Sequence, residues 1–381
     1  MKNQTNLIFI HKLLKALADG LVSVFVPLLI LKSSGSMINV IIYLSILYTL
    51  SGLLNFLLKR FLQKYGVIAI ILHCIPLILI QFLLTLKLNI GLLVLLAILG
   101  SLGQTLYAVP INILFSFSDK NTNVTKFQLS TNIGKIIMIL LGGYVLGSEL
   151  KNSLLFLSVA GTILYLTSCI PLLYGYKLLK EKYKNVNVNP VKVDNKSYKY
   201  FNIFHIAFSN FQSVIDTVLP LYLFIKNVSF ENIANIMAIK ELAKMASNLF
   251  AGFLAKKNRH LLSCILSAVF LIVSSSLILI FDNLIIYYVC DCVLAFSFPM
   301  LFVPMFAKYT TKIKNDNNHF NGMTNRDIII LPAKNFLFLP YFAFQNLIGQ
   351  FAVGFASALT VIYCCTKILK QPPERNTEQV T

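Results

Sequence analysis

Apolar stretches long enough to cross a membrane follow one another along almost the whole chain. A transmembrane helix needs about 20 predominantly apolar residues, because each residue advances the helix by about 1.5 Å and the hydrocarbon core is about 30 Å thick. Polar residues separate twelve such stretches, whose predicted bounds are 7–31, 37–58, 66–86, 90–117, 127–147, 153–176, 200–225, 232–254, 261–281, 284–307, 328–346 and 350–369. This pattern predicts an all-α integral membrane protein with twelve transmembrane helices.

Composition excludes several other classes of protein. Of the 381 residues, 57% are hydrophobic and 12% are charged, whereas a soluble protein carries about 25% charged residues. So much apolar surface is stable only against lipid, and we do not expect a soluble enzyme or a disulfide-rich secreted domain. The seven cysteines lie in apolar segments without the spacing of metal ligands, which favours a packing role. We therefore expect no metal site and no cofactor.

The distribution of basic residues orients the chain. About 23 of the 33 Lys and Arg residues lie at the two termini or in the loops after even-numbered spans, and four lie in the loops after odd-numbered spans. Because basic loops stay in the cytoplasm, this bias predicts a multi-pass protein of the cell (inner or plasma) membrane with both termini cytoplasmic. The net charge of +19 then faces anionic lipid, and we expect no nucleic acid partner.

An internal repeat divides the chain in two. When the sequence is shifted by 193 residues, segment 19–66 lies on segment 212–259 without a gap. The identical pairs are Pro27/Pro220, Leu28/Leu221, Ser36/Ser229, Asn39/Asn232, Ile46/Ile239, Asn55/Asn248 and Lys64/Lys257. The longest hydrophilic connection predicts an N-terminal six-helix bundle at 1–176, a cytoplasmic linker at 177–199 and a C-terminal six-helix bundle at 200–381. We expect the two bundles to be related by an axis along the membrane normal.

The connections after the second and eighth spans carry a recognisable pattern. The second-half connection reads Gly252-Phe-Leu254-Ala255-Lys256-Lys257-Asn258-Arg259-His260, and the first-half connection reads Lys59-Arg60-Phe61-Leu62-Gln63-Lys64-Tyr65-Gly66. They resemble the Gly-x-Leu-Ala-Asp-Arg-x-Gly-Arg pattern of the major facilitator superfamily. The resemblance assigns Lys64, Gly66, Gly252 and Lys257 to a cytoplasmic gate loop. The acidic residue that helps to latch the inner gate in that family is replaced by Gln63 and Lys256, so the gating detail differs here.

Eight charged residues of the predicted spans are candidates for binding a solute or a coupling ion. The acids are Asp19, Asp216, Glu241 and Asp291, and the bases are Lys135, Lys240, Lys244 and Lys334. An ionised side chain at the centre of a bilayer costs about 2.5–3.5 kcal/mol on insertion scales. Each of these residues therefore needs a partner, a wet cavity or a nearby interface.

Helical spacing predicts some of the partners. Lys15 precedes Asp19 by one turn, so Asp19 either forms an intrahelical pair or faces a cavity. Lys240 and Lys244 share one face of their span, and Glu241 is placed to pair with Lys244. The remaining candidates have simpler alternatives: Lys135 and Lys334 either face the cavity or extend their long side chains to the inner interface, and Asp291 is either an outer-rim residue or a helix-end acid.

These features predict a secondary active transporter of a small solute that works by alternating access. We expect proton coupling through Asp19 or Asp216, a monomer and no enzymatic activity, because no catalytic constellation or phosphate-binding loop is present. The lysines favour an anionic or zwitterionic solute. Two alternatives stay open: a multidrug or metabolite efflux antiporter, and a non-transporting membrane protein of the same fold.

Overall fold

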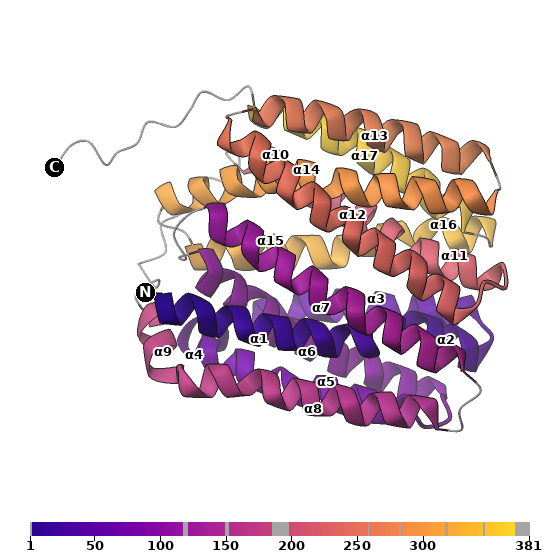
Figure 1. The fold of residues 1–381 in the computed structure, drawn as a ribbon, viewed down its shortest axis with the longest axis horizontal. Helices are drawn as coiled ribbons and strands as arrows, with labels where there is room; N and C mark the ends of the chain where they lie inside the picture. The colour runs from indigo at the N-terminus through magenta and orange to yellow at the C-terminus, as the bar shows by residue number, and fades with distance from the viewer. Residues whose placement is uncertain are drawn as a thin grey trace.

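The computed structural model describes residues 2–116, 121–148, 152–184, 198–257, 259–281, 283–316, 319–345 and 347–369. Every regular element in these ranges is helical. The helices lie side by side along one long axis, and the chain runs back and forth between the two ends of the molecule (Figure 1). The N-terminus and α9 lie at one end, and α2, α11 and α16 lie at the other (Figure 1).

The helical segments before the predicted linker overlap the first six predicted spans. They are α1 (Lys2–Leu21), the 3-10 turn η1 (Ser23–Phe25), α2 (Val26–Ser34), α3 (Met37–Leu57), α4 (Lys59–Leu72), α5 (Cys74–Leu83), α6 (Ile90–Ser116), α7 (Asn121–Gly147) and α8 (Ser153–Tyr174). A short helix, α9 (Tyr176–Lys184), follows within the predicted linker. Its Tyr183 hydroxyl donates a hydrogen bond to the carbonyl of Leu62 at 2.7 Å, and burial raises the pKa of that phenol above its usual value.

The segments after the linker overlap the last six predicted spans. They are α10 (Lys199–Ser213), the π-helical segment η2 (Val214–Val218), α11 (Leu219–Ile225), α12 (Phe230–Lys256), α13 (His260–Ile280), α14 (Leu284–Asn315), α15 (His319–Ala333), the 3-10 turn η3 (Lys334–Leu337), α16 (Leu339–Phe344) and α17 (Ile348–Leu369).

Length and composition identify fewer membrane spans than the twelve predicted stretches. Among the described residues, eight helices are long and apolar enough to cross a bilayer, or nine if the pair formed by 6–21 and 23–34, bent by 43°, counts as one span. The segments outside this set are α7, α12 and the α10–α11 run. Of these, α12 carries Lys240, Glu241 and Lys244 in its middle, and η2 interrupts the α10–α11 run.

The predicted start of the span at 328–346 is wrong, and this changes where Arg326 lies. The stretch predicted at 328–346 begins at His319, so Arg326 lies within α15 and not in a cytoplasmic loop. The Arg326 guanidinium forms an ion pair with Asp327 at 2.7 Å and lies over the ring of Phe306. Periodicity missed this extension because the polar residues at its start look like a loop.

Two helix breaks occur at equivalent positions of the sequence repeat. Segment η1 precedes Pro27, and η2 precedes Pro220. A proline has no N–H, so one carbonyl of the preceding turn loses its helical donor and the helix changes winding. Ser23 in η1 and Asp216 in η2 differ by the repeat offset of 193. Each half thus places one polar side chain at a break in its first long helix.

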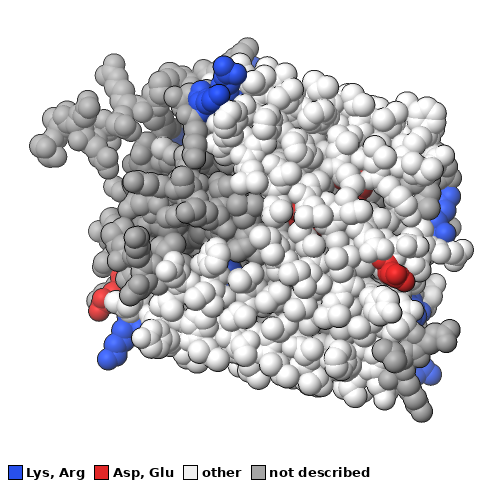
Figure 2. Space-filling view, viewed as in Figure 1, with Lys and Arg blue, Asp and Glu red and all other residues white. Residues whose placement is uncertain are grey.

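The molecular surface suits a lipid environment. Large apolar side chains are exposed along many helices, including Ile163, Leu166, Ile170 and Leu173 of α8. In the space-filling view, uncharged residues cover the middle of the molecule, and the exposed charged side chains gather toward the two ends of the long axis (Figure 2). Removing this apolar surface from water is the main reason for the chain to remain in a bilayer.

Small residues let α7 pack closely against its neighbours α1 and α12. A Cβ atom added at Gly143 would overlap the Cβ of Ala234 in α12, and one added at Gly142 would overlap the carbonyl oxygen of Leu21 in α1. Close backbone approach of this kind is how helices associate within lipid. It fixes the place of α7 between the two halves of the chain.

Gly143→Ala should therefore lower the stability of the purified protein, because the added methyl group pushes α7 away from α12. Gly91→Ala is the matched control, since a Cβ there would meet only the Asn89 side chain, at 3.5 Å. The buried cysteines allow unfolding to be followed with a thiol-reactive dye. A melting temperature of Gly143→Ala equal to that of Gly91→Ala would contradict the packing described.

Candidate functional site

A cavity of about 510 Å³ lies among segments from both halves of the chain. Its walls come from η1, α2, α3, α7, α10, η2, α12 and α14. Five of the predicted site residues line it: Lys135, Asp216, Lys240, Glu241 and Lys244. Residues separated by as much as 109 positions in the sequence thus share one polar chamber between helices that are otherwise apolar.

The charged wall of the cavity is an ion network that we call the α12 network: Asp216, Lys240, Glu241 and Lys244. The Lys244 ammonium lies 2.9 Å from Asp216 Oδ1 and 2.9 Å from Glu241 Oε1. The Lys240 ammonium lies 3.4 Å from the same Asp216 oxygen. Two acids and two lysines therefore neutralise one another, as groups removed from water must.

The local backbone explains why this network forms at α10. Pro220 cannot donate a hydrogen bond to the preceding turn, and η2 is wound as a π-helix over Val214–Val218. The carbonyl oxygen of Ile215 accepts its hydrogen bond from the Lys240 ammonium at 2.9 Å. Asp216 is held further by Gln212, whose amide nitrogen donates to Oδ2 at 3.1 Å. The break in the helix and the position of Lys240 therefore depend on each other.

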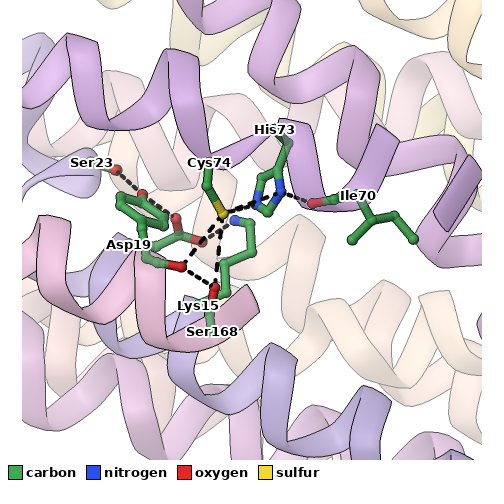
Figure 3. Close-up of polar contacts among 8 residues, drawn as sticks. Lys15, Asp19, Ser23, Ile70, His73, Cys74 and Ser168 are labelled. Atoms are coloured by element: carbon green, nitrogen blue, oxygen red, sulfur yellow. Dashed lines mark hydrogen bonds and ion pairs between the residues drawn. The ribbon is translucent and has the colours of Figure 1, made fainter. Parts of the chain in front are cut away.

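Asp19 belongs to a second polar cluster, inside the N-terminal half. The expected intrahelical pair is present, with Lys15 Nζ 2.5 Å from Asp19 Oδ2. The Tyr165 hydroxyl donates to Asp19 Oδ1 at 2.7 Å and contacts the Ser23 hydroxyl at 3.0 Å. Figure 3 shows Ser23 and Asp19 in this cluster, together with Lys15. Asp19 itself does not line the cavity, whereas Ser23 does.

Thiol and imidazole groups complete the second cluster (Figure 3). His73 Nδ1 contacts the carbonyl oxygen of Ile70, and Cys74 Sγ lies 3.9 Å from the Ser168 hydroxyl. Cys169 Sγ lies 3.2 Å from Cys74 Sγ. These groups are buried between α5 and α8, which is the packing role expected of the cysteines. No group of three or more His, Cys, Asp or Glu side chains in the described ranges is arranged to hold a metal ion.

The other predicted site residues lie outside the cavity wall. Asp291 is buried, with only 1% of the residue exposed, and its Oδ1 has no hydrogen-bond partner among the described residues. A carboxyl group in such a place is more cheaply kept neutral than ionised. The Lys334 ammonium lies 4.8 Å from the ring centre of Tyr48, and Tyr48 lines the cavity. Lys334 therefore supports the wall from behind.

The expected gate-loop residues lie within α4 and at or just after the end of α12. Lys64 lies over the ring of Tyr65 at 5.1 Å and Lys257 over the ring of Phe253 at 4.4 Å. In the described part of the chain neither lysine forms an ion pair with an acid. Gly66 has a different role, because a Cβ there would overlap the ring of Tyr183 in α9. Gly252 is half-buried within α12.

Several cavity residues escaped sequence reasoning. Ser23, Asn132, Gln212 and Asn248 all line the cavity, but uncharged polar residues are too frequent in the chain to stand out. One signal was available: Ser23 is the repeat counterpart of Asp216, and Asp19 is the counterpart of Gln212. Pairs of polar residues at corresponding breaks would have indicated a shared chamber.

Comparison with known proteins decides the family. The family model described as "Major Facilitator Superfamily" matches residues 8–325. The chain belongs to the major facilitator superfamily. Comparison with curated proteins gives no significant match.

Solved structures of this family share the fold. A bacterial homologue of the iron transporter ferroportin, in an outward-facing state with soaked iron, superposes with a TM-score of 0.68 at 14% identity, covering 96% of this chain and 99% of that chain. The family transporter FucP in its outward conformation superposes with a TM-score of 0.59 at 11% identity, covering 97% and 99%. At such low identity these likenesses concern the fold alone. As a member of this family the chain is a multi-pass membrane protein of a transporter fold, and the family's members and these neighbours are transporters rather than enzymes.

The contact between Lys244 and Glu241 should be energetically coupled. Lys244→Met leaves the 91%-buried Glu241 side chain without its nearest cation, and breaking a buried pair costs about 3–5 kcal/mol. Adding Glu241→Gln removes the stranded charge and should restore much of the melting temperature. Thermal unfolding of the wild type, both single variants and the double variant measures the coupling. If the losses in melting temperature of the two single variants simply add in the double variant, Lys244 and Glu241 are not energetically coupled.

Proposed function

We propose that the chain is a secondary active transporter that moves a small solute through the cavity by alternating access. Its twelve helical passes would form two six-helix bundles, at 1–176 and 200–381, that rock about the chamber between them. The observation that carries the proposal is the chamber itself: it lies between the two halves and is lined by the α12 network on one side. Transporter sites of this kind lie near the bilayer midplane at the interface of two repeats.

The broken helices support the proposal. Ser23 and Asp216 lie at breaks that precede Pro27 and Pro220, and both line the cavity. In transporters, discontinuous helices surround the substrate because their free backbone groups and looser winding let the wall change shape. Equivalent breaks in both halves place such a region on each side of the chamber.

Aromatic contacts join segments of the two halves at one end of the molecule. Phe230 packs against Phe25 at 6.3 Å and Phe224 at 5.1 Å between ring centres, and Lys32 lies over its ring at 5.0 Å. These residues lie toward the end that holds α2 and α11, opposite the N-terminus (Figure 1). With both termini cytoplasmic, as the basic loops indicate, these contacts lie toward the outer side of the membrane. Opening would separate α2 from α11 and α12.

We assign the coupling ion to the proton and the coupling acid to Asp216. Lys244 contacts Asp216 and Glu241 at the same distance, so protonation of Asp216 leaves this lysine with a partner. Asp216 is also 30% exposed at its side chain, so it can exchange a proton with water in the chamber. Asp19 does not line the chamber, and its two oxygens are held by Lys15 and Tyr165.

The second candidate function is efflux of lipophilic compounds. The observation in its favour is the phenylalanine wall, which consists of Phe208, Phe298 and Phe302 in the cavity lining. Transport limited to diverse lipophilic cations would support this candidate. A chain that transports nothing would belong to the non-transporting alternative.

Asp216→Asn should abolish accumulation of solute driven by a pH gradient, while exchange of solute across the membrane continues. The asparagine keeps the shape of the side chain but cannot carry the proton. Reconstituted vesicles with an imposed pH gradient and a panel of labelled metabolites measure both activities. Glu231→Gln is the matched control, because Glu231 is an exposed acid in the first turn of α12 outside the cavity. Gradient-driven accumulation by Asp216→Asn would remove the coupling role from this residue.

A further inference from the structure

We infer that Lys135 is the anion-binding residue of the chamber, and that the solute is an organic monocarboxylate with an aromatic or aliphatic body. The inference rests on the proposed transport function and names its substrate class. It begins from the charges of the cavity wall. Three lysines, at positions 135, 240 and 244, and two acids, at positions 216 and 241, line the chamber. Three positive charges less two negative charges leave one positive charge.

The geometry assigns that surplus charge to one residue. Lys240 and Lys244 form ion pairs with the two acids of the α12 network. Lys135, in contrast, has no hydrogen bond or ion pair with any residue in the described ranges of the chain, although it interacts electrostatically at longer range with Glu241 and Asp216. A cation in this position remains uncompensated within a low-dielectric bundle until an anion enters.

Neighbouring side chains give the anion further donors. Asn132 lies three residues before Lys135 on α7, so both project from one face of the helix, and both line the chamber. Asn248 of α12 lines it as well. A carboxylate has two oxygens, which suits an ammonium group together with amide N–H donors.

The remaining wall suits the body of the solute. The rings of Phe208 and Phe298 lie 4.0 Å apart between centres, and Phe208 and Phe302 lie 5.2 Å apart. Tyr43 and Tyr48 line the chamber from α3. This surface stabilises an apolar or aromatic group by removing it from water, and ring faces add stacking. A solute that contacts both the donors around Lys135 and this aromatic wall therefore carries its charge at one end only.

The count of free charges separates monoanions from other solutes. A phosphate monoester or a dicarboxylate carries about two negative charges and would need a second free cation, which the described wall does not offer while Asp216 is ionised. A zwitterion would need a free acid for its ammonium group, but Asp216 and Glu241 are already paired. A lone carboxylate matches the single surplus charge.

The charge balance agrees with coupling to one proton. The empty chamber with Asp216 ionised carries one surplus positive charge. When a carboxylate binds and Asp216 takes a proton, the chamber again carries one surplus positive charge. The net charge of the protein and its bound solute inside the membrane is then the same on both journeys. Transport of one carboxylate with one proton should therefore respond to the pH gradient and not to the membrane potential.

The test uses matched probes on the purified full chain in lipid nanodiscs. Phenylacetate, phenylacetamide and phenethylamine have the same ring with a negative, neutral or positive end group, and phenyl phosphate adds a dianion. Binding is measured by thermal shift and by competition with labelled phenylacetate. We expect phenylacetate to stabilise the wild type and the other three probes to have little effect. Stabilisation by the amide or the amine equal to that by the acid would overturn the inference, as would failure of every monocarboxylate tried.

Variants then locate the site. Lys135→Met should weaken phenylacetate binding by roughly tenfold or more, because a charge-assisted hydrogen bond is lost, whereas Lys135→Arg should retain it. Lys87→Met, in an exposed connection, is the control and should bind as the wild type does. Folding of each variant is checked by its melting temperature without ligand. Unchanged binding by a folded Lys135→Met would overturn the assignment.

Failure of this inference is distinguishable from failure of the proposed function. If phenylacetate binds through Lys135 but vesicles show no uptake or exchange, the anion site stands and the transport proposal falls. If vesicles transport another class of solute in an Asp216-dependent manner and no carboxylate binds, transport stands and the substrate class assigned here is wrong.

Discussion

Mutual neutralisation of charge within the membrane is the constraint on which this structure depends. The α12 network brings two acids and two lysines into contact at 2.9–3.4 Å, and each member would be costly to bury alone. The network also holds the backbone, because Lys240 satisfies the Ile215 carbonyl in the π-helical segment before Pro220. The ion network, the helix break before Pro220 and the wall of the chamber therefore depend on one another.

Close packing of α7 brings this arrangement to the centre of the molecule. Glycines at 142 and 143 allow α7 to lie against α1 and α12 together, and the same helix carries Lys135 into the chamber. A bulkier α7 would move its lysine away from the acids of α12. The second polar cluster acts differently: Asp19 is paired by Lys15 and Tyr165, and Ser23, which contacts Tyr165, lines the chamber.

The sequence predicted the helical segments and the local charge pairs, because both follow from rules that act over a few residues. A run of about 20 apolar residues predicts a span, and the Lys15–Asp19 and Glu241–Lys244 contacts follow from helical spacing. The direction in which each helix faces was not predictable, since nearly every face is apolar. For this reason the spacing did not show that Asp291 is buried, or that Lys334 lies over the ring of Tyr48 without lining the chamber.

Residues that act across helices required the structure. Tyr165 contacts Asp19 over 146 positions, and nothing in the spacing distinguishes it from other tyrosines. The internal repeat was the most informative long-range pattern, since it relates Ser23 to Asp216 and both lie at helix breaks in the cavity wall. The family match and the solved relatives agree with the transporter fold, and at 11–14% identity the solved structures concern the fold alone.

The most direct measurement of the central claim is the accessibility of the chamber from the two sides of the membrane. Thr217 lines the chamber, so Thr217→Cys in a chain without its native cysteines can be labelled by a membrane-impermeant thiol reagent. Leu221→Cys is the control, because Leu221 is fully buried one turn further along. The account predicts that position 217 is labelled from either side, in right-side-out and inside-out vesicles, and that position 221 is labelled from neither. Labelling of position 217 from one side only, under all conditions, would contradict alternating access.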